Sequence, residues 1–148
     1  MTMKIKRIDH IGIVVNDLAK VKQFFIDFGF TVQGEADEQG ELLDKVVGIK
    51  GAKSQVVFLQ APNGQITLEL AKFIHPADKS EVQKSFIYSH GMQHLAFAVE
   101  NIEDIVGNMK QKGYEVFVDT YNYENMYKLC YFRGPEGIII ELAEQLQK

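Results

Sequence analysis

The chain carries one sequence plan twice. The run "RIDHIGIVVNDLAKV" at residues 7–21 returns in different letters as "MQHLAFAVENIEDIV" at residues 92–106. Each run places a histidine at the head of an apolar segment, and His94 follows His10 by 84 positions (94 − 10). Repetition of a whole plan at a fixed spacing indicates two structural modules of the same kind.

Each copy predicts a helix followed by three strands. Asp17 and Asn101 are favourable N-cap residues, and Gly29 and Gly113, also 84 positions apart (113 − 29), stand where a helix ends in the left-handed conformation. The strand-like runs are "FTVQG", "SQVVFLQ" and "ITLELAKF" in the first copy and "YEVFVD", "YKLCYFR" and "IIIELAE" in the second. With the strand that opens each copy, the order is β-α-β-β-β. We therefore expect an α+β fold of two βαβββ modules.

Two segments fall outside the repeat. Residues 35–53 of the first copy have no counterpart of equal length, and they are either a flap over a site or a surface excursion. Residues 74–91 predict a linker with a candidate short helix at residues 80–88. The chain is then one domain, 1–148, with module one at about 5–73 and module two at about 92–146.

Composition limits the classes of protein and partner. A chain of 148 residues, 46% hydrophobic and 24% charged, fits one soluble domain with a substantial core. It has no run of about 18 apolar residues and no signal-peptide pattern at its start, so we expect a cytoplasmic protein without membrane contact. A single cysteine, Cys130, excludes an internal disulfide and a cysteine-based zinc site. Because 16 basic residues face 20 acidic ones, a small-molecule partner is favoured over nucleic acid.

Alternation along the strands separates a bulky face from a face that carries one ionisable residue. In the first strand Ile11, Ile13 and Val15 share one face, and His10 lies on the other with small residues. Three further strands have the same pattern. Because the bulky faces can pack on helices, we expect the other faces to line a cavity with two imidazoles and two carboxylates. The four cavity-facing residues are His10, Glu69, His94 and Glu141.

A divalent metal ion accounts for this quartet better than four separate structural roles do. A lone histidine or glutamate on a strand is usually structural, and a carboxylate buried among apolar side chains is unfavourable unless it is paired. Two imidazoles and two carboxylates suit Zn²⁺, Ni²⁺, Co²⁺, Mn²⁺ or Fe²⁺. Since the four groups recur symmetrically, we predict that they hold one such ion. His75 and His90 lie outside the pattern, and we expect them on the surface or in the linker.

The runs "DHIGIVVNDL", "ITLEL", "QHLAFAV" and "IIIEL" together resemble the vicinal oxygen chelate superfamily over about residues 5–145. That superfamily contains glyoxalase I, methylmalonyl-CoA epimerase, extradiol dioxygenases, fosfomycin-resistance proteins and bleomycin-binding proteins. The closing run "YFRGPEGIIIELAE" is especially similar to glyoxalase-type members. The resemblance implies two βαβββ modules that form a cupped half-barrel around a metal, often within a homodimer whose modules pair in one chain or swap between two. It does not fix the substrate, because members catalyse unrelated reactions.

The resemblance assigns the family's two metal histidines to His10 and His94 and its two carboxylates to Glu69 and Glu141. Glyoxalase I typically uses His or Gln, Glu, His and Glu, which this chain matches. Extradiol dioxygenases and fosfomycin-resistance proteins usually have three protein ligands, the epimerase commonly has Gln at the second position, and bleomycin-binding relatives lack the set.

One departure concerns the turn before each glutamate. Gly64 precedes Glu69 by five positions, whereas Gly137 precedes Glu141 by four. The first module must therefore absorb one residue in the turn or in a bulge. Until that residue is located, the direction of Glu69 is less defined than that of Glu141.

A glyoxalase I-like reaction is the function that the resemblance implies. The metal would hold two oxygens of a small thiol hemithioacetal, or a related oxyanion substrate, and stabilise its enediolate, while Glu141 or Glu69 moves a proton as base and then acid. The chain's only arginines, Arg7 and Arg133, are candidates for contacting substrate carboxylates. The alternatives are a non-catalytic protein that binds or sequesters a small molecule, and another metal-dependent member, namely an epimerase, a thiol transferase or a dioxygenase.

Overall fold

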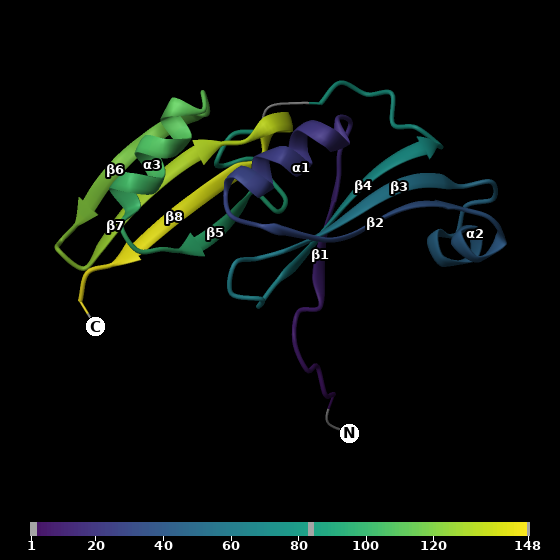
Figure 1. Cartoon of the computed structure of the whole chain (residues 1–148), viewed down its shortest axis with the longest axis horizontal. Helices are drawn as coiled ribbons and strands as arrows, with labels where there is room; N and C mark the ends of the chain where they lie inside the picture. Colours follow the sequence, from purple (N-terminus) through teal and green to yellow (C-terminus); the bar gives the residue numbers. More distant parts are fainter. Residues whose placement is uncertain (1–2, 83–84, 148) are drawn as a thin grey trace. The chain divides into compact units, whose positions relative to one another are not determined.

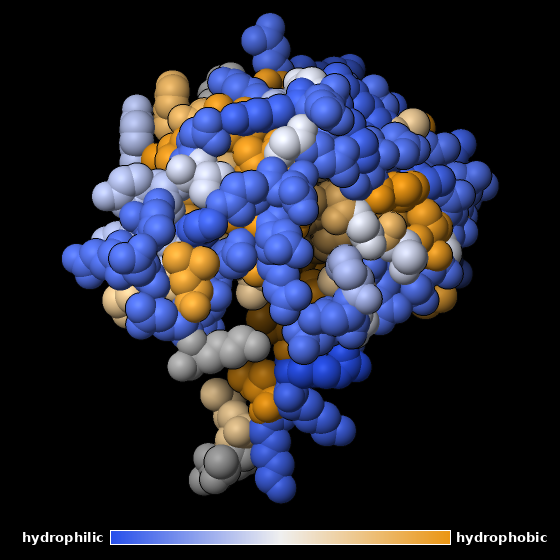
Figure 2. All heavy atoms as spheres, turned by 60° about the vertical axis from the view of Figure 1, so that its left-hand side comes forward, coloured by the Kyte–Doolittle hydropathy of each residue, from blue (hydrophilic) through white to orange (hydrophobic). Residues whose placement is uncertain are grey.

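The computed structural model describes residues 3–82 and 85–147, and the chain forms two compact units whose boundary in the sequence lies between Glu81 and Val82. No helix in these residues is long and apolar enough to cross a membrane. Hydrophilic side chains cover most of the face shown in Figure 2, with apolar side chains in separate patches between them. Each unit has its own sheet and its own core, so the two are described in turn.

The first unit is built on one four-stranded mixed sheet (Figure 1). Its strands lie in the order β1-β4-β3-β2; β1 and β4 are parallel and the other pairs are antiparallel. Helix α1 follows β1, and a second helix, α2, lies between β2 and β3. The elements are β1 (His10–Val14), α1 (Leu18–Asp27), β2 (Thr31–Gln39), α2 (Glu41–Val47), β3 (Lys53–Gln60) and β4 (Thr67–His75).

Helix α1 forms as the sequence predicts and covers one face of that sheet. The Asp17 carboxylate accepts a hydrogen bond from the Lys20 backbone N–H at 3.1 Å, and the chain leaves the helix through Gly29 at φ 109°. Val21, Phe24 and Phe25 are fully buried. Each such side chain contributes about 1.5–3 kcal/mol of hydrophobic stabilisation, so the packing of α1 fixes which face of the sheet is open.

The insert at residues 35–53 extends β2 and adds α2. Helix α2 ends at Gly48, which is in the left-handed conformation with φ 74°. None of its residues is buried, and Leu42 is 78% exposed. The insert is therefore a surface segment of the first unit, and its role as a flap stays a prediction.

The second unit repeats the topology of the first. Its sheet has the order β5-β8-β7-β6, again with a parallel pair, β5 and β8, at one edge (Figure 1). Helix α3 packs across β6 and β8, and a 3₁₀ turn at Pro135–Gly137 leads into the last strand. The elements are β5 (His94–Ala98), α3 (Ile102–Gln111), β6 (Glu115–Tyr123), β7 (Tyr127–Arg133) and β8 (Ile139–Gln145). The predicted α+β fold of two repeated modules is confirmed, with α2 as the addition.

One local prediction in the second half is confirmed only in part, and another is wrong. Asn101 is the N-cap residue of α3, as predicted, but its backbone is left-handed at φ 56° and its side chain makes no capping bond. The Glu144 carboxylate accepts the Ile102 N–H at 2.8 Å instead. The helix predicted at residues 80–88 is absent from the described part of that segment, which omits residues 83 and 84. Residues 86–89 instead form a turn, in which the Ser89 N–H donates to the Phe86 carbonyl at 3.0 Å.

Candidate functional site

The first unit brings His10 and Glu69 together on the face of its sheet that α1 does not cover. Strands β1 and β4 run parallel in a register that aligns His10 with Thr67 and Gly12 with Glu69. His10 Nε2 lies 3.2 Å from Glu69 Oε2. A Cβ at Gly12 would meet no atom within 4 Å, so the space beside the glutamate is open. Because Gly12 has no side chain, no atom at that position covers the pair on the open face.

The second unit builds the same pair from β5 and β8. The register aligns His94 with Ile139 and Ala96 with Glu141. His94 Nε2 lies 3.1 Å from Glu141 Oε2. In both units the glutamate follows the residue aligned with the histidine by two positions, which places imidazole and carboxylate on one face of neighbouring strands. The repeat in the sequence is therefore a repeat of local geometry.

The extra residue of the first module is absorbed in the turn between β3 and β4. The Gly64 N–H donates to the Ala61 carbonyl at 2.8 Å, and the Ala61 N–H donates to the Ile66 carbonyl at 2.9 Å. The β1–β4 ladder has no register shift. Glu69 consequently takes the same place relative to His10 as Glu141 takes relative to His94.

The four side chains differ in exposure. The exposed fractions are 47% for His10, 28% for Glu69, 36% for His94 and 17% for Glu141. The residues that flank the glutamates along the strands point the other way and are fully buried, as Leu68, Leu70, Ile140 and Leu142 show. Each pair is thus accessible from one side and supported by an apolar core on the other.

An aspartate that the sequence analysis did not select holds His10. Asp9 Oδ2 lies 2.9 Å from His10 Nδ1, and Asp9 Oδ1 lies 3.2 Å from an Arg7 guanidinium nitrogen. Because a carboxylate only accepts, we assign the proton to Nδ1, which leaves the Nε2 lone pair on the side of Glu69. The hydrogen bond that His10 donates to Asp9 raises the pKa of His10 against the opposing effect of burial, and the charge of Glu69 adds to the rise. The sequence signal for this contact was the aspartate directly before the histidine.

The second unit has no carboxylate at that position. Gln93 precedes His94, and its amide donates to the His90 carbonyl at 3.1 Å. Tyr131 contacts the pair instead: its ring meets the His94 ring edge-on at 5.7 Å between centroids, and the β7–β8 register places it opposite Glu141. The pKa of Tyr131 is raised, mainly by burial. The charge of Glu141 and a hydrogen bond to Glu141 raise it further. The sequence could have predicted that Tyr131 lies opposite Glu141, because counting equal numbers of residues in both directions from the middle of the "GPEGI" turn aligns residue 131 with residue 141.

Both arginines proposed for substrate binding are engaged within the protein. Arg7 pairs with Asp9, as described above. Arg133 is 10% exposed; its guanidinium donates to the Ser85 carbonyl at 2.7 Å and lies 4.7 Å from the centre of the Phe117 ring. Arg133 therefore ties residue 85 to β7, and the substrate-binding roles of both arginines remain predictions. His75 and His90 are exposed and lie outside the two pairs.

The chemistry of each pair suits a divalent metal ion. Two ligand atoms at about 2.0–2.2 Å from an ion and roughly at right angles to each other lie about 3 Å apart, which is close to both nitrogen–oxygen distances. Within residues 3–82 and 85–147 no three or more His, Cys, Asp or Glu side chains gather as a metal site. Each unit by itself presents two donors, and the prediction of one ion held by all four remains a hypothesis.

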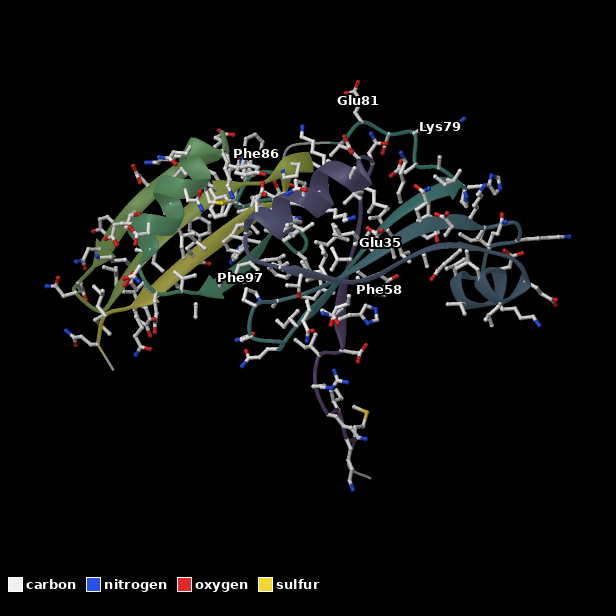
Figure 3. The ribbon with its side chains drawn as sticks, in the orientation of Figure 1. Glu35, Phe58, Lys79, Glu81, Phe86 and Phe97 are labelled. Atoms are coloured by element: carbon white, nitrogen blue, oxygen red, sulfur yellow. The ribbon has the colours of Figure 1, made fainter. Side chains whose placement is uncertain are left out.

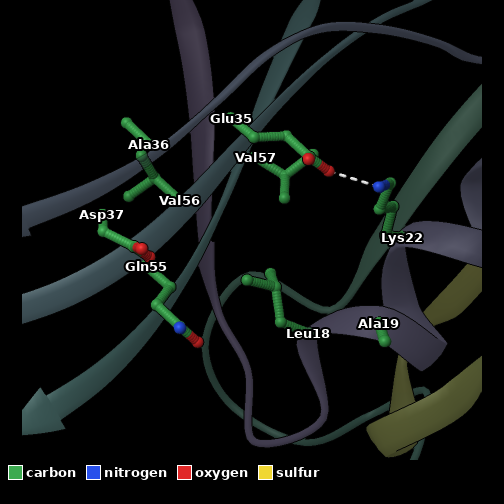
Figure 4. A pocket seen from close by; sticks show the side chains of 9 residues that line it. All are labelled: Leu18, Ala19, Lys22, Glu35, Ala36, Asp37, Gln55, Val56 and Val57. Carbon is green, nitrogen blue, oxygen red and sulfur yellow. Dashed lines mark hydrogen bonds and ion pairs between the residues drawn. The ribbon is translucent and has the colours of Figure 1, made fainter.

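A separate pocket lies on the other face of the first unit's sheet (Figure 4). It has a volume of about 400 Å³ and is crossed by an ion pair between Lys22 and Glu35. Glu35 is aligned with Val57 on the helix-facing side, whereas Phe58 is aligned with Glu69 on the open side; Figure 3 labels Glu35 and Phe58. The pocket therefore takes no part in the His10–Glu69 pair. Its lining residues are Leu18, Ala19, Lys22, Glu35, Ala36, Asp37, Gln55, Val56 and Val57.

Comparison with known proteins agrees with this geometry. The chain is 28% identical to the protein YaeR of Escherichia coli (strain K12) over 95% of its length and 98% of the relative. It is 24% identical to mitochondrial methylmalonyl-CoA epimerase of Mus musculus over 95% of its length and 74% of that protein. A crystal structure of a glyoxalase family protein from Bacillus cereus superposes with a TM-score of 0.90 at 32% identity, covering 98% of this chain and 97% of that one.

The family model of the Glyoxalase/Bleomycin resistance protein/Dioxygenase superfamily matches residues 7–142, a range that contains all four residues of the two pairs. The repeated topology, the shared register of the two parallel strand pairs and the similarity to a glyoxalase family structure over nearly the whole chain point the same way. The chain therefore belongs to this superfamily, the vicinal oxygen chelate superfamily.

Proposed function

We propose that the chain is a metal-dependent enzyme of glyoxalase type, which moves a proton between adjacent carbons of a small oxygen-bearing substrate. The observation that carries this proposal is the repeated histidine–glutamate pair on an open sheet face. In the proposal both pairs bind the same divalent ion. The two pairs come either from one chain or from the two chains of a homodimer. Superfamily members often dimerise.

The proposed reaction divides between the ion and the side chains. A bound divalent ion would polarise two neighbouring substrate oxygens and stabilise the negative charge that develops on them. His10 and His94 act as neutral donors, and Asp9 keeps the His10 lone pair on Nε2. One carboxylate removes a proton from carbon; the electron pair of the broken C–H bond moves onto the substrate oxygens, and the same carboxylate returns the proton to the adjacent carbon.

The substrate that we propose is the hemithioacetal of a small aldehyde and a low-molecular-weight thiol. This proposal is supported by the four side chains His, Glu, His and Glu. They match the ligand set that the resemblance to glyoxalase I implies. The test is a steady-state assay with methylglyoxal and several thiols, each with added Ni²⁺, Zn²⁺, Co²⁺, Mn²⁺ or Fe²⁺. Turnover in at least one combination is expected, and the absence of turnover in all of them contradicts a glyoxalase I activity.

An epimerase is the second candidate, favoured by the similarity to mouse methylmalonyl-CoA epimerase over 95% of this chain. The same site would remove and return a proton next to a thioester carbonyl. Incorporation of deuterium from heavy water into methylmalonyl-CoA, monitored by mass spectrometry, distinguishes this activity from the first. Tight ligand binding without turnover or exchange would instead favour a binding or sequestration protein.

A further inference from the structure

The starts of α1 and α3 differ in how closely they pack on their sheets. Positions 18 and 22 of α1 correspond to positions 102 and 106 of α3 in the repeat. Ile102 is fully buried and Val106 is 4% exposed, whereas Leu18 and Lys22 are only half-buried. Helix α3 packs on β6, while α1 packs on β3 and β4. The pocket of Figure 4 lies in the space that remains between the start of α1 and strands β2 and β3.

This pocket has the size of a small-molecule site and a mixed lining. Its volume of about 400 Å³ falls within the range of about 300–1,000 Å³ that is usual for ligand pockets. Leu18 and Val57 supply apolar surface, and Figure 4 shows the Leu18 side chain extending from α1 toward the strands. The ion pair of Lys22 with Glu35 joins the helix to β2 at one side. An occupant would therefore meet both apolar and charged walls.

Asp37 and Gln55 provide hydrogen-bond acceptors that no protein group uses. The β2–β3 register aligns the two residues, which places their Cβ atoms about 4.5–5.5 Å apart on the helix-facing side of the sheet. Within residues 3–82 and 85–147, neither side chain makes a hydrogen bond or an ion pair. A carboxylate and a carboxamide oxygen both accept N–H groups. The two side chains thus form an acceptor pair in the wall of the pocket.

The charges of the lining favour a positively charged occupant. Lys22 neutralises Glu35, so the unpaired Asp37 leaves one net negative charge in the pocket. Lys72 is aligned with Gln55 on the next strand and is not part of the lining. A cation that donates N–H groups would gain a charge-assisted hydrogen bond to Asp37, whereas an anion would be repelled.

We propose that this pocket binds a small organic cation, an ammonium or guanidinium group on a short aliphatic chain. The cation donates to Asp37 and to the side-chain oxygen of Gln55, and the chain lies against Leu18 and Val57. Because the pocket is on the helix-facing side of the sheet and Glu69 is on the other, binding requires no metal. The site is therefore independent of the proposed function.

The selectivity of the pocket is tested with three probes on one butyl chain. The ¹⁵N-labelled full-length chain is titrated with n-butylguanidinium, n-butylammonium and, as the anionic control, pentanoate, and the backbone amides are followed by NMR. At least one cation is expected to give saturable shifts at Ala36, Asp37 and Val56, and pentanoate none. Absence of saturable shifts with both cations, or equal binding of pentanoate, overturns the proposal.

Neutral replacements of two adjacent carboxylates locate the charge that matters. Asp37→Asn is expected to weaken binding of the cation about three- to fivefold, the upper end for an exposed ion pair. Glu38→Gln is the matched control, because it removes a charge from the next residue of β2, whose side chain points to the other face. It should leave the affinity unchanged. Melting temperatures verify that both variants fold, and equal losses in the two would overturn the assignment of Asp37.

A gain of affinity provides a test that structural damage cannot imitate. Lys22→Met keeps the length of the side chain, removes the partner of Glu35 and adds one net negative charge to the pocket. Cation binding is expected to strengthen about two- to threefold, on the scale of an exposed ion pair. The same NMR titration measures it. Unchanged or weaker binding in Lys22→Met would contradict selection by charge.

Discussion

In the first unit a carboxylate holds the histidine of the pair, whereas in the second unit a phenol packs against it. Asp9 accepts from His10, whereas Tyr131 lies opposite Glu141 on the neighbouring strand and its ring meets the His94 ring edge-on. The strand register and the nitrogen–oxygen distance are nevertheless the same in both units. Duplication has kept the donor atoms and changed their neighbours. The difference indicates that two pairs with one geometry need not have one chemical role.

The largest expected effect compares the cores beneath the two pairs. Phe25 of α1 and Met109 of α3 occupy equivalent positions in the repeat and are almost fully buried. Replacement by alanine leaves a cavity, so Phe25→Ala is expected to cost about 3–5 kcal/mol and Met109→Ala about 2–5 kcal/mol. Urea unfolding followed by circular dichroism measures both. Leu42→Ala, at a position 78% exposed, is the control and should change stability by less than about 0.5 kcal/mol.

Removal of either histidine should have similar consequences if both pairs serve one ion. His10→Ala and His94→Ala are each expected to weaken Ni²⁺ and Zn²⁺ binding by more than about 100-fold, beyond the effect of a supporting residue. Competitive titration with a chelator gives both affinities. If either variant binds the metal as tightly as the unmodified chain, the histidine it lacks is not a ligand, and the two pairs do not serve one ion.

A smaller effect should distinguish the two histidines in their pH dependence. Asp9 raises the pKa of His10, so His10 takes up a proton at a higher pH than it would without that neighbour. Protons compete with metal for the imidazole, and Asp9→Asn should therefore lower the pKa and move the loss of metal to lower pH. An NMR titration of the His10 ring in the metal-free protein checks the first part. An unchanged His10 midpoint in Asp9→Asn contradicts the assignment of the hydrogen bond.

The smallest expected effect compares the starts of α1 and α3. Asp17→Ala removes a capping bond to the Lys20 N–H and should cost about 1 kcal/mol. Asn101→Gly should change stability by only a few tenths of a kcal/mol, because the Asn101 side chain makes no capping bond and glycine adopts its positive φ readily. Urea denaturation resolves the difference. A larger loss in Asn101→Gly than in Asp17→Ala would contradict the capping geometry.

The repeat made the topology predictable, and the alternation of side chains made the pairs predictable. A period of 84 fixed the number of modules, and the small residues beside His10 and His94 identified the open faces before any coordinates. The sequence did not determine the strand register that places Glu69 beside His10. Only the hydrogen-bonded turn between Ala61 and Ile66 shows where the additional residue lies.

The neighbours of the pairs could not be predicted in the same way. The bond between Asp9 and His10 depends on side-chain rotamers, and the contact of Tyr131 with His94 depends on the alignment of three strands. The Glu144 carboxylate that accepts the Ile102 N–H lies 42 positions along the chain, so the local preference for asparagine gave the N-cap position of α3 but not the group that accepts the hydrogen bond. These contacts are made by tertiary packing, which a local pattern does not contain.

The most direct test of the central hypothesis is the anomalous diffraction of a crystal grown with Ni²⁺ and recorded at the nickel absorption edge. We expect one strong peak per chain, within about 2.0–2.2 Å of a nitrogen of His10, a nitrogen of His94 and carboxylate oxygens of Glu69 and Glu141. In a dimer with swapped modules, two of these ligands come from each chain. Two separate ions per chain, one at each pair, or no ion at either pair, would contradict it.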